Sequence, residues 1–290
     1  MRKLSLGTAQ FGLNYGISNQ TGKVKVQEVK KILQLAKNSN IDTIDTAIVY
    51  GDSEKVIGDI GFKNFQIITK LPALHEDCED IYSWVEKNVK LSLKRLKTPS
   101  LYGLLVHRTE DLLGNYGMKL INALKIIKKN GLVKKIGISI YDPSECEKVM
   151  KLTRMDIVQA PLNIIDRRLE LSGWLSKLSK NKIEIHTRST FLQGLLLTPL
   201  KNIPPKFNIW NDIWKKWSQE IEKNKLDKIT ECLSYPLSHP EISRVIVGID
   251  SLSQFKEIIK ASKTNFKIKD WSLLSSTDQR LINPFNWKNL

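Results

Sequence analysis

The 290-residue chain has little cysteine and no long apolar run. Its three cysteines, Cys78, Cys146 and Cys232, lie far apart and in no Cys-x-x-Cys spacing, which argues against a disulfide framework or a structural zinc site. No apolar stretch approaches the roughly 18 residues that a membrane span needs. The basic start is followed by no apolar segment of the kind found in secretory signals. These absences predict a cytoplasmic protein with no metal and no membrane partner.

The composition is that of a globular chain. Hydrophobic residues make up 41% and charged residues 26%, so the sequence can bury a core and is not disordered by composition. The length fits one large domain or two medium ones. Because no internal linker is visible, we expect a single barrel domain over residues 1–290.

The charge is strongly positive. Lys and Arg total 46 against 30 Asp and Glu, which gives a net charge of +16. Such a balance fits nucleic acid, an anionic membrane surface or anionic small molecules. However, the basic residues of segment 87–97 alternate with apolar ones at helical spacing, as on the solvated face of an outer helix. No zinc finger, helix-turn-helix or RNP string accompanies the charge, so we expect no specific nucleic-acid partner.

Short β-branched runs alternate with longer amphipathic stretches along the whole chain. The runs predict strands near residues 4–7, 43–45, 66–69, 102–106, 135–139, 157–159, 183–186 and 245–248. The stretches repeat apolar residues at three and four positions, which predicts helices over 26–38, 53–60, 81–96, 118–129, 143–152, 169–179, 226–237 and 252–261. The order is therefore strand, then helix, eight times over.

Eight such units in a chain of this length favour a parallel (β/α)8 TIM barrel of the α/β class. The alternative is an open doubly wound sheet, which predicts a phosphate-binding Gly-x-Gly-x-x-Gly after a strand. That string is absent, since Gly7, Gly12 and Gly16 are too widely spaced for it. Outside the repeat, residues 198–225 predict a long loop and an inserted helix after strand seven. Residues 271–290 predict a C-terminal tail that packs on the barrel.

Chemistry in a TIM barrel takes place at the carboxyl ends of the strands. Asp45, Lys70 and His107 end predicted strands two, three and four, and Tyr50 lies five residues past Asp45. Each residue alone has a structural explanation, such as a turn cap or a buried histidine, but the set is chemically complementary. A nearby ammonium lowers the pKa of a tyrosine, and a carboxylate holds that ammonium in place. The set predicts a general acid that protonates an oxygen while a hydride reaches its carbon.

One string carries a specific resemblance. Asp45-Thr-Ala-Ile-Val-Tyr50-Gly51-Asp-Ser53-Glu54 resembles the Asp-x-Ala-x-x-Tyr-Gly-x-Ser-Glu signature of the aldo/keto reductase superfamily. Further anchors follow in the family's order at 67–70, 104–107 and 135–139. The resemblance covers nearly the whole chain and agrees with the strand ends.

The resemblance implies roles for these residues. Tyr50 is then the proton donor, Asp45 and Lys70 tune it, and His107 orients the carbonyl. The implied cofactor is NADP(H) or NAD(H), bound extended over the barrel mouth. Its implied contacts are Gly7, Thr8, Ser139, Gln159, Arg188, Ser189, Gly248, Asp250, Ser251, Gln254 and Glu257.

Two departures from the family pattern concern the nicotinamide end. Ile140 stands where many members carry an Asn beside the carboxamide-binding serine, and Asn163 is a candidate to compensate. Arg188 or one of its neighbours stands where the aromatic residue that stacks on the nicotinamide is usual. A guanidinium can also stack on a flat ring.

A third departure concerns the adenosine end. Asp250 occupies a place that is often basic or small in members that bind the 2′-phosphate of NADP. A carboxylate there repels that phosphate and can accept a hydrogen bond from a ribose hydroxyl. Arg244 or Lys256 could offset it, so the preference between NAD and NADP stays open.

The main functional hypothesis is reduction of an aldehyde, ketone or sugar carbonyl to an alcohol. The alternative is a cofactor-binding regulatory or accessory protein with little turnover. The substrate pocket is expected to be walled by Phe11, Tyr15 and the aromatic segment 210–217. Segment 188–194 resembles reductases linked to surface-polysaccharide sugars, which suggests a sugar or nucleotide-sugar substrate. No heptad or long apolar patch demands a partner chain, so we expect a monomer.

Overall fold

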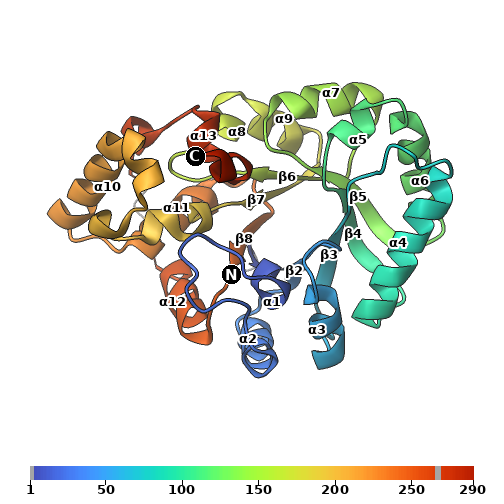
Figure 1. Cartoon of the computed structure of the whole chain (residues 1–290), viewed down its shortest axis with the longest axis horizontal. Helices are drawn as coiled ribbons and strands as arrows, with labels where there is room; N and C mark the ends of the chain where they lie inside the picture. The colour runs from blue at the N-terminus through green and yellow to red at the C-terminus, as the bar shows by residue number, and fades with distance from the viewer. Residues whose placement is uncertain (1–2, 265–268) are drawn as a thin grey trace.

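The computed structural model describes residues 3–264 and 269–290. Eight parallel strands close into a barrel in sequence order, and this confirms the predicted fold (Figure 1). The strands are β1 (Leu4–Gly7), β2 (Thr43–Asp45), β3 (Gln66–Leu71), β4 (Leu101–Val106), β5 (Val133–Ser139), β6 (Ile157–Pro161), β7 (Glu184–Arg188) and β8 (Arg244–Gly248). Each predicted strand is confirmed, most of them extended by one or two residues.

Helices follow the strands and form an outer ring (Figure 1). The long ones are α2 (Val26–Asn38), α3 (Ser53–Ile60), α4 (Ile81–Leu96), α6 (Gly117–Lys129), α7 (Ser144–Leu152), α11 (Lys228–Ser238) and α12 (Leu252–Ser262). All were predicted within two residues at each end. Short helical turns were not predicted, because a four-residue turn shows no periodicity; these are α1 (Ala9–Gly12), α5 (Glu110–Leu113) and α13 (Gln279–Ile282).

One predicted helix is wrong in extent. The pattern over residues 169–179 predicts a single helix, whereas the chain forms α8 (Arg168–Leu171) and α9 (Trp174–Lys180). Gly173, between them, has a φ of +77°. This left-handed conformation cannot continue a right-handed helix, and glycine adopts it at little cost.

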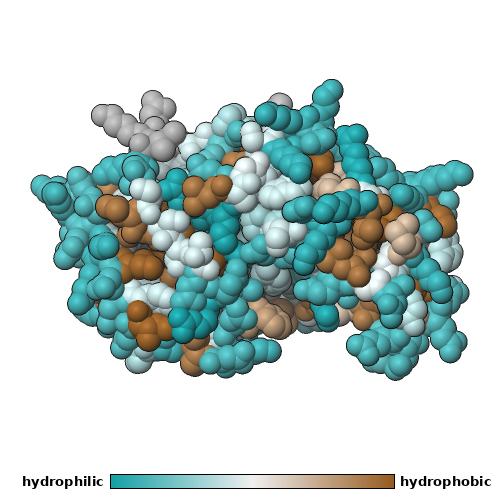
Figure 2. Space-filling model, turned by 90° about the horizontal axis from the view of Figure 1, so that it is seen from above, coloured by the Kyte–Doolittle hydropathy of each residue, from teal (hydrophilic) through white to brown (hydrophobic). Residues whose placement is uncertain are grey.

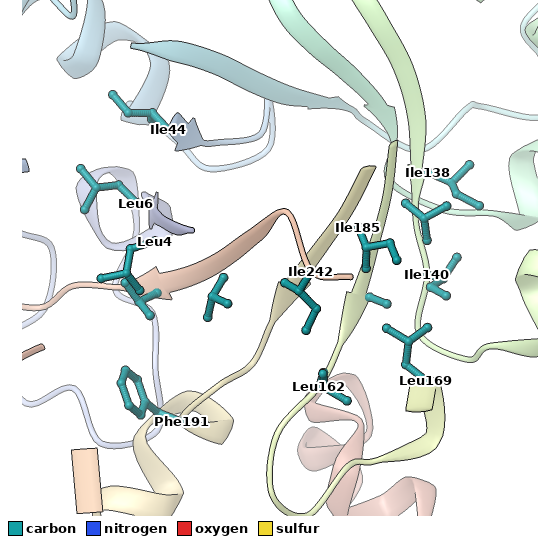
Figure 3. Close-up of a cluster of buried hydrophobic side chains, with 14 of the residues drawn as sticks. Leu4, Leu6, Ile44, Ile138, Ile140, Leu162, Leu169, Ile185, Phe191 and Ile242 are labelled. Carbon is teal, nitrogen blue, oxygen red and sulfur yellow. The ribbon is translucent and has the colours of Figure 1, made fainter. Parts of the chain in front are cut away.

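The apolar residues of the strands separate into two clusters. Outward-facing side chains such as Leu4, Leu6 and Ile185 belong to the large cluster beneath the helices (Figure 3). A small second cluster joins Ile68 and Ile157, which come from strands that do not pair in the barrel. It therefore fills the barrel lumen, and alternate strand positions point inward.

The insertion after β7 contains the expected helix, α10 (Asn211–Lys223), which lies outside the ring at the left of Figure 1. It is preceded by the 3-10 turns η1 (Leu192–Leu197), η2 (Leu200–Asn202) and η3 (Pro205–Trp210). The tail, with η4 (Ser272–Leu274) and η5 (Pro284–Asn289), packs as predicted. Trp217 meets Trp271 with ring centroids 5.1 Å apart, and Phe207 meets Trp287 at 4.9 Å.

The visible surface is mostly hydrophilic, with apolar side chains in separate small patches (Figure 2). Within residues 3–264 and 269–290, each helix is either too short or too polar to cross a membrane.

Gly12 allows α1 to lie against the loop that carries Tyr50. A β-carbon at Gly12 would be 1.8 Å from the Tyr50 carbonyl oxygen and 2.6 Å from the Ser53 nitrogen. Since both are backbone atoms, the Gly12→Ala substitution must displace this loop. We expect a loss of about 1–3 kcal/mol in the free energy of unfolding, measured by urea denaturation. Gly114→Ala is the control, because its nearest contact would be 3.4 Å; equal losses in the two variants would contradict the expectation.

Candidate active site

A buried ion pair lies at the carboxyl ends of β2 and β3. The Lys70 ammonium is 2.6 Å from Asp45 Oδ1 and donates a second hydrogen bond, 2.8 Å long, to the Thr46 carbonyl. Asp45 Oδ2 accepts from Gln159 Nε2 at 2.7 Å. Asp45, Lys70 and Gln159 are at most 4% exposed. Buried charges persist only when their hydrogen-bonding groups are satisfied, and here β2, β3 and β6 each supply a partner.

Tyr50 and His107 complete the cluster predicted at these strand ends. Lys70 Nζ is 5.3 Å from the centroid of the Tyr50 ring. The His107 ring meets the Tyr50 ring edge-on, with centroids 6.1 Å apart and an interplanar angle of 77°. Both rings are half-buried. The structure thus brings together all four residues that the sequence singled out.

The pKa of Tyr50 differs from the sequence expectation. Burial raises it above the ordinary value, the Asp45 carboxylate raises it further, and Arg188 opposes this only in part. The expected lowering by Lys70 is wrong for this structure, because Asp45 balances the ammonium charge at 2.6 Å and burial disfavours a phenolate. Tyr50 therefore holds its proton at neutral pH.

The pKa of His107 is lowered to about 3, first by burial and then by the positive charges of Lys70 and Arg188. The ring is neutral over the physiological range. A neutral imidazole carries one N–H donor and one acceptor nitrogen, so His107 can still donate one hydrogen bond to a ligand.

A cleft opens above this cluster, with about 860 Å³ of empty space, part of it open to solvent. Asp45 and Tyr50 line it. So do most of the predicted cofactor contacts, namely Gly7, Thr8, Gln159, Arg188, Ser189, Gly248, Asp250 and Gln254.

The pattern of the Aldo/keto reductase family matches residues 3–279. The chain belongs to the aldo/keto reductase family. It is 26% identical over 285 residues to "Uncharacterized oxidoreductase YqkF" of Bacillus subtilis (strain 168), covering 90% of this chain and 91% of that protein. The family assignment makes the chain an oxidoreductase that acts on carbonyl groups.

Solved aldo-keto reductases share the fold. AKR11C1 from Bacillus halodurans, in its holo form, is 19% identical with a TM-score of 0.73, over 97% of this chain and 92% of that one. The thermostable aldo-keto reductase Tm1743, in complex with the inhibitor epalrestat, is 21% identical with a TM-score of 0.69, over 93% of each chain.

Three residues expected at the cofactor site do not line the cleft. Ser139 is buried beneath it, with its hydroxyl 3.5 Å from Gln159 Oε1. Ser251 is the N-cap of α12 and accepts from the Gln254 nitrogen at 3.1 Å. Glu257 is exposed on α12. Ser139 and Ser251 support residues of the cleft, whereas the Glu257 side chain forms no hydrogen bond or ion pair with a residue of the cleft within the described ranges.

Asn163 does not take over the family's missing asparagine. Its Nδ2 donates to the Ser189 carbonyl at 2.9 Å, and its Oδ1 accepts from the Ile165 and Asp166 nitrogens, each at 2.9 Å. The side chain is fully buried and both ends of its amide are used. Asn163 therefore fixes the backbone of the loop after β7 and does not face a ligand.

Arg244 and Lys256, the two candidates to offset the negative charge of Asp250, both lie outside the cleft. Arg244 begins β8, at the opposite end of the strand from the cleft, and pairs with Asp42 at 3.1 Å. Lys256 is exposed on α12 and is not among the residues of the cleft. Asp250 itself lines the cleft, and its Oδ1 is buried without a partner.

The expected aromatic walls are partly wrong. Tyr15 lines the cleft, whereas Phe11 is fully buried in the core. Trp214 and Trp217 of the insertion are also buried and donate to the carbonyls of Phe207 and Leu196. A tryptophan-rich amphipathic stretch is compatible with a pocket wall and with a buried core. Here the tryptophans pack in the core.

Sequence reasoning missed Tyr141, which lies two residues past Ser139. The Arg188 guanidinium lies 4.5 Å from the centroid of the Tyr141 ring. The Tyr141 hydroxyl raises the pKa of Tyr50. An aromatic residue just past a strand end in a TIM barrel was the available signal.

The neutral His107 predicts a specific pH dependence of stability. A free imidazole titrates near 6.5, and His107 in the folded chain near 3, so between these values the unfolded chain binds a proton that the folded chain does not. The stabilisation that the neutral His107 contributes to the fold is therefore fully present above pH 6.5, and it is lost as the pH falls toward 3. Between pH 7 and pH 5, the free energy of unfolding of wild type should fall by about 1–2 kcal/mol more than that of His107→Gln. Urea denaturation at each pH measures both.

The matched control is His75→Gln. His75 is exposed, and its side chain is 80% accessible, so this substitution should leave the pH dependence as in wild type. Parallel curves for wild type and His107→Gln would show that His107 is protonated in the folded chain.

Proposed function

We propose that this aldo/keto reductase reduces an aldehyde, ketone or sugar carbonyl to an alcohol with NADPH or NADH. The observation that carries the proposal is the buried Asp45–Lys70 pair directly behind Tyr50 at the floor of an open cleft. A positive charge held behind a phenol stabilises the phenolate that forms when the phenol gives up its proton.

Each side chain has one task in this mechanism. Tyr50 gives its proton to the carbonyl oxygen as negative charge develops there. Lys70, held by Asp45, stabilises the phenolate that remains. The neutral His107 donates its N–H toward the same oxygen and so orients the carbonyl. The nicotinamide supplies the hydride when it is bound.

The cleft offers groups that fit a dinucleotide. Thr190 lines the same cleft as Tyr50, and its Oγ1 is buried without a partner. Gln159, Gly7 and Thr8 also line the cleft. At the other end, Asp250 Oδ1 also lacks a partner. Gly248 and Gln254 would hold the phosphates and adenosine, with Arg188 and Ser189 near the nicotinamide. Ser139 and Ser251 would support Gln159 and Gln254 from outside the cleft.

A second candidate is a cofactor-binding regulatory or accessory protein with little turnover. The observation that favours it is Arg188, whose charge occupies the place of a neutral aromatic residue in the family. Tight NADH or NADPH binding, measured by fluorescence, with no turnover across varied carbonyls would support it. Turnover of an aldehyde panel would exclude it, and a protein that binds neither dinucleotide would exclude both candidates.

Removing the Tyr50 hydroxyl tests the proton donor. Tyr50→Phe should lower kcat by about 10²–10⁴-fold, because only the transferred proton is lost. The dissociation constants of NADH and NADPH, measured by fluorescence titration, should stay within about twofold. Tyr116→Phe is the control, since Tyr116 is half-buried at the start of α6 and outside the cleft. If Tyr50→Phe retains the wild-type rate, the acid is a different group.

Removing the charge of Asp250 tests the adenosine end. Asp250→Asn should strengthen NADPH binding relative to NADH by about tenfold, because a carboxylate no longer repels the 2′-phosphate. Dissociation constants of both dinucleotides give the ratio. Glu79→Gln, which removes the same charge from an exposed position, should leave the ratio unchanged. An unchanged ratio in Asp250→Asn would place the ribose 2′-position away from this carboxylate.

A further inference from the structure

Arg188 is a half-buried guanidinium in the cleft with no carboxylate partner. It lines the cleft together with Tyr50. Its hydrogen bonds go to neutral oxygens, the Ile140 carbonyl at 2.9 Å and the Ser189 hydroxyl at 3.3 Å. Within residues 3–264 and 269–290, no Asp or Glu forms an ion pair with it. By contrast, Arg167 and Arg168 nearby in sequence each pair with acidic side chains.

The surroundings hold this guanidinium in place. Its Cζ atom lies over the Tyr141 ring, 4.5 Å from the ring centroid. The Tyr141 carbonyl accepts from Arg168 at 2.9 Å, and Arg168 is itself paired with Asp166 at 2.8 Å. The next residue, Ser189, has a φ of +64°, a strained conformation for a serine. Such strain persists where surrounding contacts impose it, and it concentrates at ligand sites.

The guanidinium has donors left for a ligand. Arginine carries five N–H donors, of which two are used here, by Ile140 and Ser189. Beside it, Thr190 is 2% exposed, lines the same cleft, and its Oγ1 has no hydrogen-bond partner. A half-buried charge and a buried unpartnered hydroxyl two residues apart in the chain are costly unless a ligand satisfies them.

We propose that Arg188, with Thr190 beside it, binds a carboxylate of the substrate, and that the enzyme acts on carbonyl compounds that carry a carboxylate near the reacting carbon. The inference rests on the proposed function. A carboxylate matches the planar fork of a guanidinium. Arg188 lies at the reacting end of the cleft, where its charge acts on Tyr50 and His107. The Asp45–Lys70 pair has no net charge, so Arg188 supplies the uncompensated positive charge at this end.

The test compares two aldehydes that differ in one carboxylate, succinic semialdehyde and butanal, at saturating NADH or NADPH. Wild type should show at least a tenfold higher kcat/KM for the acid, as expected for a charge-assisted hydrogen bond. Arg188→Gln should remove this preference through KM, lowering kcat/KM for succinic semialdehyde at least tenfold more than kcat/KM for butanal, because only the acid loses a partner for its carboxylate. Arg188→Lys should retain part of it, because the charge stays while the fork is lost.

The control is Arg108→Gln, which removes an equal charge from an exposed residue next to His107; it should keep the preference. If wild type turns over both aldehydes equally well, or if Arg188→Gln keeps the preference, the inference is wrong while the proposed function stands. If Arg188→Gln weakens dinucleotide binding as much as it lowers kcat/KM for the acid, Arg188 serves the cofactor and the inference is also wrong. Turnover of neither aldehyde would count against the inference and the proposed function together.

Discussion

The structure of the site depends on one buried ion pair, Asp45 with Lys70 at 2.6 Å. Both groups lie in the barrel lumen, where an isolated charge would be lost to neutralisation. Removing either partner would leave the other buried and unpaired, at a cost of about 3–5 kcal/mol. Gln159 and the Thr46 carbonyl take up further hydrogen bonds of the pair. The pair is thus a stable structural element as well as an electrostatic one.

The fold holds this pair from outside the barrel too. Thr69, whose side chain points away from the lumen beside Lys70, donates to Glu54 at 2.6 Å. Glu54 is 1% exposed and also accepts from Ser92 and pairs with Arg95 of α4. Because Glu54 lies in α3, which begins three residues after Tyr50, this network fixes the Tyr50 loop relative to β3. The signature string therefore encodes both the acid and its support.

The sequence predicts the features that follow from a repeated pattern of residues. It does not predict those that depend on the balance of opposing contributions such as burial and charge. The barrel and its strand ends follow from periodicity, so the convergence of Asp45 and Lys70 could be predicted. The direction of the Tyr50 pKa shift could not, because burial and the Asp45 charge outweigh Lys70 only at the distances found. Phe11 and the tryptophans of α10 fit a pocket wall as well as a core. The break at Gly173 rests on the conformation of one residue.

A hydrogen bond from Arg188 to the Ile140 carbonyl connects the ends of β7 and β5. The Ile140 side chain is fully buried in the core. Its carbonyl, however, accepts from the Arg188 guanidinium. An arginine reaches across from β7 to the end of β5 and needs only a backbone oxygen there, so the side chain at 140 is free to be apolar. The Arg188 guanidinium thereby places a fixed positive charge in the cleft, and this charge sets the electrostatics of the cleft without altering the barrel that holds it.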